Sequence, residues 1–189
     1  MEPAEEEIVK KYGRYQLFDA IQEGATVDII QDILHSYHDP IESIFLHYID
    51  LSTSLKDGML SIHKALAFAR NDIVELFLSI NPDLAQIPYR DNPITHLALV
   101  LGGFENFRGQ CTACLNTLLR NNAVIDAVDR LGRTILHWAG FYNMAEMTGQ
   151  LIDIGLDGMS KDYAQMTVVD ICIEKDNIET LIVLVSYFV

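Results

Sequence analysis

A short motif returns along the chain at a nearly fixed interval, and this interval constrains the fold more than any other feature. A His-x-Ala core occurs at His63, His96 and His137, and Asp170 begins a copy of the same shape. Two of the three intervals between these positions are equal, and the middle one is longer. A more degenerate copy, Gln16–Ala20, precedes the first by a longer interval still. A repeat of this kind predicts an array of similar structural units.

Each copy of the motif is followed by a short break and then by a second apolar run with helical periodicity. In one unit Asn71 and Asp72 precede the run, and in another Asn143 does. Each unit is therefore expected to form a helix, a turn, a second helix and a connecting loop. A single helix pair cannot bury both of its apolar faces, whereas stacked pairs can, so the sequence predicts an all-α solenoid.

The motif resembles the opening of the ankyrin repeat, a helix pair of about 33 residues that begins Thr-Pro-Leu-His-x-Ala. The two equal intervals match that repeat length, and the best copy is Thr134–Ala139, in which Ile135 stands in place of the proline. The resemblance implies stacked helix-turn-helix units with projecting loops, called fingers, beside a concave helical face. We expect a single domain over residues 1–189, with approximate units 12–54, 55–87, 88–128, 129–161 and 162–189.

Two of the intervals are longer than the others. The extra residues after the first unit fall in or near residues 35–54, where apolar residues recur at helical intervals after Pro40, so an additional short helix is expected there. The other insertion, residues 102–110, is expected to lengthen the turn between the two helices of the third unit. Its Phe104, Phe107 and Arg108 either form a recognition loop or fold back onto their own repeat, and the sequence leaves both alternatives open.

The charge of the chain excludes several functional classes. Thirteen Lys and Arg residues stand against 27 Asp and Glu, a formal net charge of −14, which disfavours direct contact with nucleic acid or with an anionic membrane surface. The longest apolar stretch, residues 181–189, is too short to cross a bilayer. The acidic first residues do not resemble a secretory signal, so a cytoplasmic or nuclear location is expected.

The residues that could carry catalysis have simpler explanations. The resemblance implies that His63, His96 and His137 bind loop backbone and order the fingers. Cys111 and Cys114 have the spacing of half a zinc site, but no second pair follows, and they are expected to be small core residues. We therefore expect no enzymatic activity, no cofactor and no metal.

Two aspartates are candidates for an acid–base pair. Asp19 lies in the first unit and Asp170 in the fifth, and their separation along a solenoid argues against a dyad. What remains is recognition of another protein through the surface.

The ankyrin resemblance implies that partners meet the finger residues before each motif and the residues that follow the first helix. These positions are rich in aromatic residues and arginine, which dominate interface energetics. An alternative for Phe68, Leu101 and Phe141 is packing between neighbouring repeats. The expected partner-binding residues, including those of the insertion, are Phe68, Tyr89, Arg90, Leu101, Phe104, Phe107, Arg108, Arg130, Arg133, Phe141, Tyr142 and Tyr163.

These observations predict a non-enzymatic protein–protein interaction module that acts as an adaptor or a masking inhibitor. The alternative is the interaction domain of a longer transcription cofactor or signalling protein. The expected partner is a protein that presents an acidic segment with an apolar anchor, because Arg binds carboxylates with two hydrogen bonds. Residues 178–189 are apolar on nearly every face, so we expect them to be covered by more of the chain, by a second copy through self-association, or by the partner.

Overall fold

The computed structural model describes residues 16–35 and 59–188, and within these ranges all the regular elements are helices. The one bridge between backbone segments there joins Tyr89 and Asn92 in a loop. The described part of the chain is therefore all-α, as the sequence predicted. The extra helix expected within residues 35–54 lies almost wholly outside the described residues.

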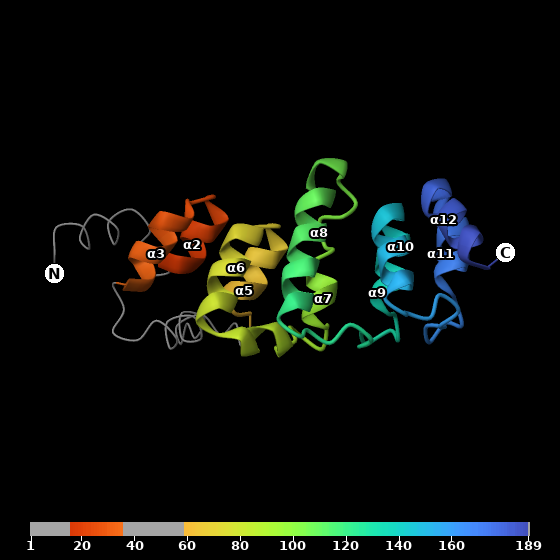
Figure 1. The fold of residues 1–189 in the computed structure, drawn as a ribbon, viewed down its shortest axis with the longest axis horizontal. Helices are drawn as coiled ribbons and strands as arrows, with labels where there is room; N and C mark the ends of the chain where they lie inside the picture. The colour runs from red at the N-terminus through yellow and green to blue at the C-terminus, as the bar shows by residue number, and fades with distance from the viewer. Residues whose placement is uncertain (1–15, 36–58, 189) are drawn as a thin grey trace.

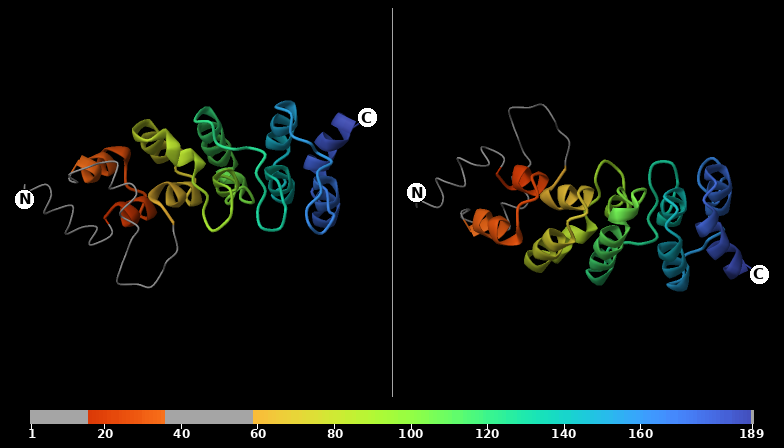
Figure 2. Two further views of the ribbon diagram at one scale, coloured as in Figure 1. Left: turned by 90° about the horizontal axis from the view of Figure 1, so that it is seen from below. Right: turned by 90° about the horizontal axis from the view of Figure 1, so that it is seen from above.

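The helices form two rows that run along the long axis of the molecule (Figures 1 and 2). The inner row holds the first helix of each pair: α2 (Gln16–Gln22), α5 (Ser61–Ala67), α7 (Ile94–Leu97), α9 (Ile135–Phe141) and α11 (Val168–Lys175). The outer row holds the second: α3 (Val27–His35), α6 (Asn71–Ile80), α8 (Glu105–Arg120), α10 (Ala145–Asp153) and α12 (Ile178–Phe188). A short 3-10 helix, η2 (Pro82–Gln86), follows α6.

Close contacts join each helix to its pair mate or to a neighbouring pair. Along the inner row α2 packs on α5, α5 on α7, α7 on α9 and α9 on α11. Along the outer row α3 packs on α6, α6 on α8 and α10 on α12, whereas α8 and α10 make no comparable contact. One apolar core runs continuously from Leu17 to Leu151, and a smaller one around Val168, Cys172 and Leu184 serves the last pair.

The recurring histidines connect successive units. Nε2 of His63 donates to the carbonyl of Ile87 at 2.9 Å, that of His96 to Arg133 at 3.0 Å, and that of His137 to Met166 at 3.1 Å. Each acceptor lies in the loop that leads to the next unit, so the expected bonds to loop backbone are confirmed. In the last unit Asp170 replaces the histidine and accepts from the backbone N–H of Thr167 at 2.8 Å.

The insertion in the third unit is only partly a turn. Residues 98–104 form turns, but residues 105–110 are helical and lengthen α8 at its N-terminal end. The expectation that the whole of residues 102–110 lengthens the turn is therefore wrong for Phe107 and Arg108, which lie in the first turn of α8. The extra length of α8 projects beyond the other outer helices in Figure 1.

The last helix pair leaves apolar side chains at the surface. Ile178, Ile182, Val185 and Phe188 of α12 are exposed, as is Ile173 of α11, whereas Thr180 and Leu184 are buried. Much of the apolar surface of this segment is therefore not covered by the other described residues. In the same two ranges no helix is both long enough and apolar enough to cross a membrane.

Candidate protein interface

Three aromatic side chains of the fourth unit form a connected group, which we call the α9 cluster: Trp138, Phe141 and Tyr142. The Trp138 and Tyr142 ring centroids lie 5.7 Å apart, and those of Phe141 and Tyr142 lie 5.2 Å apart, edge to face. Their spacing of three and four residues places them along one side of α9 and its C-cap. Phe141 is 42% exposed and the other two are half-buried, so the cluster can contact a partner.

A cation lies at each end of the α9 cluster. The guanidinium carbon of Arg133 is 4.8 Å from the Trp138 ring centroid, and Nζ of Lys175 on α11 is 5.1 Å from that of Phe141. Both distances fit a cation–π contact. The result is a half-exposed aromatic stripe with a cation at each end. Each cation also pairs with a carboxylate, Arg133 with Asp129 and Lys175 with Glu174.

Asp129 fixes one end of this arrangement. Its carboxylate accepts hydrogen bonds from the backbone N–H groups of Leu131 (2.8 Å) and Arg133 (3.0 Å), from Nε of Arg133 (2.9 Å) and from the Trp138 indole (3.0 Å). Burial acts to raise the pKa of Asp129, but these hydrogen bonds together outweigh it and hold the pKa below its usual value. The carboxylate therefore stays charged and holds Trp138 and the finger in one geometry.

The turn before α8 lies against the other side of the α9 cluster. A methyl group added to Gly103 would come within 3.2 Å of the Tyr142 ring, so the backbone approaches this ring closely. From the same segment Arg108 donates to the carbonyls of Gly102 at 3.2 Å and Tyr142 at 3.3 Å. The next residue after Gly103, Phe104, is 61% exposed. The structure thus brings the insertion and the α9 cluster together.

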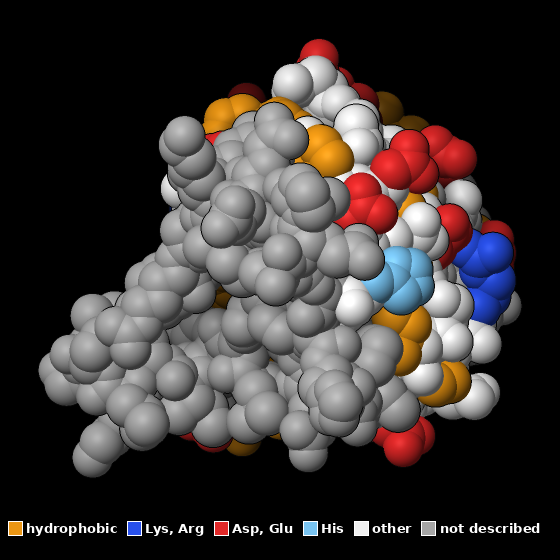
Figure 3. Space-filling view, turned by 90° about the vertical axis from the view of Figure 1, so that its left-hand side faces the viewer, with side chains coloured by type: hydrophobic (Ala, Val, Ile, Leu, Met, Phe, Trp, Pro, Cys, Tyr) orange, Lys and Arg blue, Asp and Glu red, His pale blue; other side chains and the backbone are white. Residues whose placement is uncertain are grey.

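A smaller aromatic group lies near the N-terminal end. Nζ of Lys64 lies 4.6 Å from the ring centroid of Phe18 and 4.9 Å from that of Phe68, and it donates to the side chain of Gln22 at 2.7 Å. Burial lowers the pKa of Lys64, and the nearby Asp19 acts in the opposite direction. Phe68, at 38% exposure, is separated from the α9 cluster by the third unit. Seen from this end, the described surface carries acidic and hydrophobic patches and little positive charge (Figure 3).

The predicted finger residues brace neighbouring fingers. The Arg130 guanidinium donates to the carbonyl of Arg90 at 3.3 Å, and the N–H of Tyr163 donates to the carbonyl of Leu131 at 3.0 Å. The Tyr163 ring, 73% exposed, covers Gly132 so closely that a Cβ there would clash at 2.5 Å. Gly132 also has a φ of +76°, which glycine adopts without strain, whereas Gln165 has a similar φ of +65° at the corresponding position of the next finger.

Other predicted site residues have roles inside the protein. Tyr89 is only 9% exposed, and its ring lies 5.4 Å from that of His63, so it offers almost no surface to a partner. Leu101 and Phe107 pack on the edge of the main core. Arg133 is paired with Asp129, with Nη2 and Oδ2 2.9 Å apart, and its charge is largely neutralised. These four residues contribute mainly to the structure of the surface.

Sequence reasoning missed the residues that organise the cluster. Asp129 and Asp162 are one repeat interval apart, and each accepts two backbone N–H groups of its own finger. This recurrence, at the same distance before His137 and Asp170, was a usable signal. The ankyrin resemblance places Lys175 among the residues that follow the first helix of a unit, but its contact with Phe141 depends on how two units stack and could not be predicted.

The groups considered for catalysis are separated or buried. Asp19 on α2 and Asp170 on α11 belong to the first and last helix pairs (Figure 1). Cys111 and Cys114 are fully buried in the main core, and burial raises the pKa of Cys114 to about 12. In the part of the chain that the structure describes, no three His, Cys, Asp or Glu side chains gather as metal ligands would.

Comparison with known proteins adds no relative. The chain matches no protein-family model and no curated protein.

Proposed function

We propose that the chain is an ankyrin-type solenoid whose function is to bind another protein. Two stacked rows of helices, a motif that recurs at a regular interval and histidines that bond the next loop all support this architecture. The inner row with its fingers is the proposed binding side. The molecule acts as an adaptor or a masking inhibitor and not as an enzyme.

The observation that carries the proposal is the half-exposed α9 cluster between two cations. Large aromatic side chains contribute much binding free energy when a partner removes them from water. Arg130 adds positive charge near a surface that is otherwise acidic, which favours a partner segment with carboxylates around an apolar anchor. Phe104 extends the apolar contact on the side of α8.

A double substitution tests this surface. In capture from native extract followed by mass spectrometry, Phe141→Ala with Tyr142→Ala should remove the partner that the unmodified chain retains, since each aromatic hot spot contributes about 2 kcal/mol or more. Circular dichroism should remain helical. The matched control is Ile154→Ala, which removes an exposed apolar side chain from the end of α10 and should leave capture intact. Equal capture by both variants would place the interface elsewhere.

A charge reversal tests the partner's chemistry. Arg130→Glu should weaken binding of the captured partner more at low salt than at high salt, because exposed charges are screened within about 8–10 Å at physiological ionic strength. Arg133→Glu should weaken binding too, but it also breaks the pair with Asp129 and should lower the melting temperature. Stronger binding of the Arg130→Glu variant would overturn the proposed acidic partner.

Self-association through residues 178–189 stays a prediction, supported by the exposed apolar side chains of α12. Sedimentation equilibrium and hydrophobic-dye binding on the 189-residue chain check it. A monomer without a dye-accessible patch would contradict it.

A further inference from the structure

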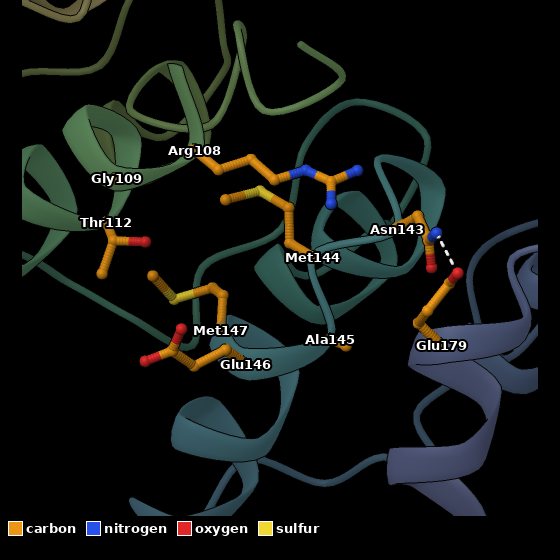
Figure 4. A pocket seen from close by; sticks show the side chains of 9 residues that line it. All are labelled: Arg108, Gly109, Thr112, Asn143, Met144, Ala145, Glu146, Met147 and Glu179. Carbon is orange, nitrogen blue, oxygen red and sulfur yellow. Dashed lines mark hydrogen bonds between the residues drawn. The ribbon is translucent and has the colours of Figure 1, made fainter. Parts of the chain in front are cut away.

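The outer row is interrupted between α8 and α10 by a groove, which we call the outer groove. It has a volume of about 420 Å³ and is open to solvent. Its lining comes from three elements of the outer row and the turn before α10 (Figure 4). The lining residues are Arg108, Gly109, Thr112, Asn143, Met144, Ala145, Glu146, Met147 and Glu179.

The third unit explains why the groove is open. The segment before α8 is held to the end of α9 by the two Arg108 hydrogen bonds, and its Gly102 backbone approaches Met144 so closely that a Cβ would clash with the sulfur. These contacts fix the upper end of α8 over the loop between α9 and α10. The remainder of α8 then packs on α6 and makes no comparable contact with α10.

The floor and the rim of the groove differ in chemistry. Met144 and Met147 turn toward the space in Figure 4 and give it an apolar, adaptable floor. Glu146 and Glu179 lie on different sides of that floor. Their hydrogen-bond partners are neutral amides, Gln150 for Glu146 and Asn143 for Glu179.

The one cation in the lining does not neutralise this rim. The Arg108 guanidinium donates to the backbone carbonyls of Gly102 and Tyr142. Within residues 16–35 and 59–188, no ion pair forms at Glu146 or Glu179. The hydrogen bond from Asn143, helped by a smaller effect of the Arg108 charge, holds the pKa of Glu179 below its usual value, so its carboxylate is charged at neutral pH. The rim therefore presents two negative charges that no ion pair neutralises in the described ranges.

From this combination we propose that the outer groove binds a basic amphipathic helix of a partner protein. A groove between two helices accepts a third helix whose apolar side chains enter it. The methionines would contact those apolar side chains, while Lys or Arg on the flanks would pair with Glu146 and Glu179. The net charge of −14 adds a general attraction for a basic segment. This site lies on the outer row, and its partner chemistry is opposite to that proposed for the α9 cluster.

The test uses the full chain and a labelled synthetic peptide of about five helical turns, with leucines along one face and lysines on the other. Fluorescence anisotropy should show saturable binding. A matched peptide with each lysine replaced by glutamate should bind at least about tenfold more weakly. Equal binding of the two peptides would overturn the charge argument.

Variants of the chain separate the groove from general attraction. Glu146→Lys with Glu179→Lys should weaken binding of the lysine peptide by about tenfold or more. The control, Glu23→Lys with Asp28→Lys on the first helix pair, changes the net charge equally and should have a much smaller effect. Equal weakening by the two double variants would show that the peptide follows net charge alone and would overturn the site.

A further variant tests the cavity without changing charge. Thr112→Phe places an aromatic ring in the groove from α8. It should weaken peptide binding about as strongly as the double Glu→Lys variant does, while the helical circular dichroism stays unchanged. Undiminished binding by this variant would overturn the assignment to the groove. Phe141→Ala alone, which leaves the contacts of Tyr142 with Gly103 and Arg108 in place, should bind the peptide normally, so failure at the α9 cluster and failure here are distinguishable.

Discussion

Helix α8 has a different neighbour on each side in the outer row. Its contact with α6, which we call the closed joint, is tightly packed, whereas its border with α10, which we call the open joint, contains the outer groove. At the closed joint Thr117 is buried and donates to Asn71 at 2.8 Å, and Phe77 and Cys114 are fully buried nearby. At the open joint the same helix borders the outer groove. Repeats with similar sequences therefore need not pack alike, because a few added residues at one helix start redirect the helix.

The inner row shows what holds the open joint together. The His96 side chain donates to the carbonyl of Arg133 at 3.0 Å, and α7 packs on α9. The third and fourth units are thus joined through the inner row and the fingers, while the outer row is left apart. This difference predicts unequal responses to matched substitutions.

The largest expected effect is truncation at the closed joint. Phe77→Ala should lower the free energy of unfolding by about 3–5 kcal/mol, because it leaves a cavity among fully buried side chains. Met147→Ala at the open joint should lower it by about 2 kcal/mol, since the new space is continuous with solvent. Urea titrations of both variants check the order. Equal losses would show that the outer groove is closed in solution.

The next effect concerns the bonds between units. His137→Ala and His96→Ala should each lower the free energy of unfolding by about 1–3 kcal/mol, because loop carbonyls lose their buried donors. His96→Ala should in addition weaken peptide binding at the outer groove, since it loosens the open joint, and His137→Ala should not. Differential scanning calorimetry and the anisotropy assay measure the two effects. An unchanged melting temperature would contradict the structural role.

The same histidines predict a pH dependence. Burial lowers the pKa of His63, His96 and His137 in the folded state, so folding favours their neutral form. Their contribution is fully present above the unfolded pKa of about 6.5 and is lost as the pH falls through the lower folded values. The melting temperature should therefore fall on acidification below about pH 6.5. The fall should be smaller in His137→Ala.

Alanine substitutions at two glycines should differ in how much they lower the free energy of unfolding. At Gly140 a Cβ would lie 2.5 Å from Cγ2 of the buried Val168, so Gly140→Ala should lower the free energy of unfolding by about 1–3 kcal/mol. At Gly102 the nearest atom belongs to the flexible Met144, which can move into the outer groove. Gly102→Ala should therefore have the smaller effect, and thermal unfolding of both variants decides the order.

The smallest effect is expected at an exposed ion pair across the closed joint. Arg120 and Glu75 lie 3.3 Å apart, but their side chains are 68% and 52% exposed. Arg120→Met should change stability by less than about 1 kcal/mol. A large loss would mean that the closed joint depends on surface charge more than on buried side chains.

The helix pairs and the histidine hydrogen bonds were predictable because each depends on a pattern that recurs along the sequence. Val27–His35 and Asn71–Ile80 follow from apolar spacing, and the bonds of His63 and His137 follow from their recurrence at one repeat position. The sequence assigns Arg133 to partner binding and does not predict its pairing with Asp129, because that pairing depends on the conformation of the finger. The outer groove was beyond prediction, since it depends on the angle at which one lengthened helix leaves its turn.

The restriction of close contacts to neighbouring pairs has a consequence for amide hydrogen exchange. No single opening needs to disrupt the whole core, so protection should vary along the array instead of reflecting one global event. The amides of α12, which packs on one side only, should exchange earliest among the C-terminal helices, while those of α6, covered by α3, α5 and α8, should exchange last. Binding at either proposed surface would then appear as slower exchange confined to the units it spans.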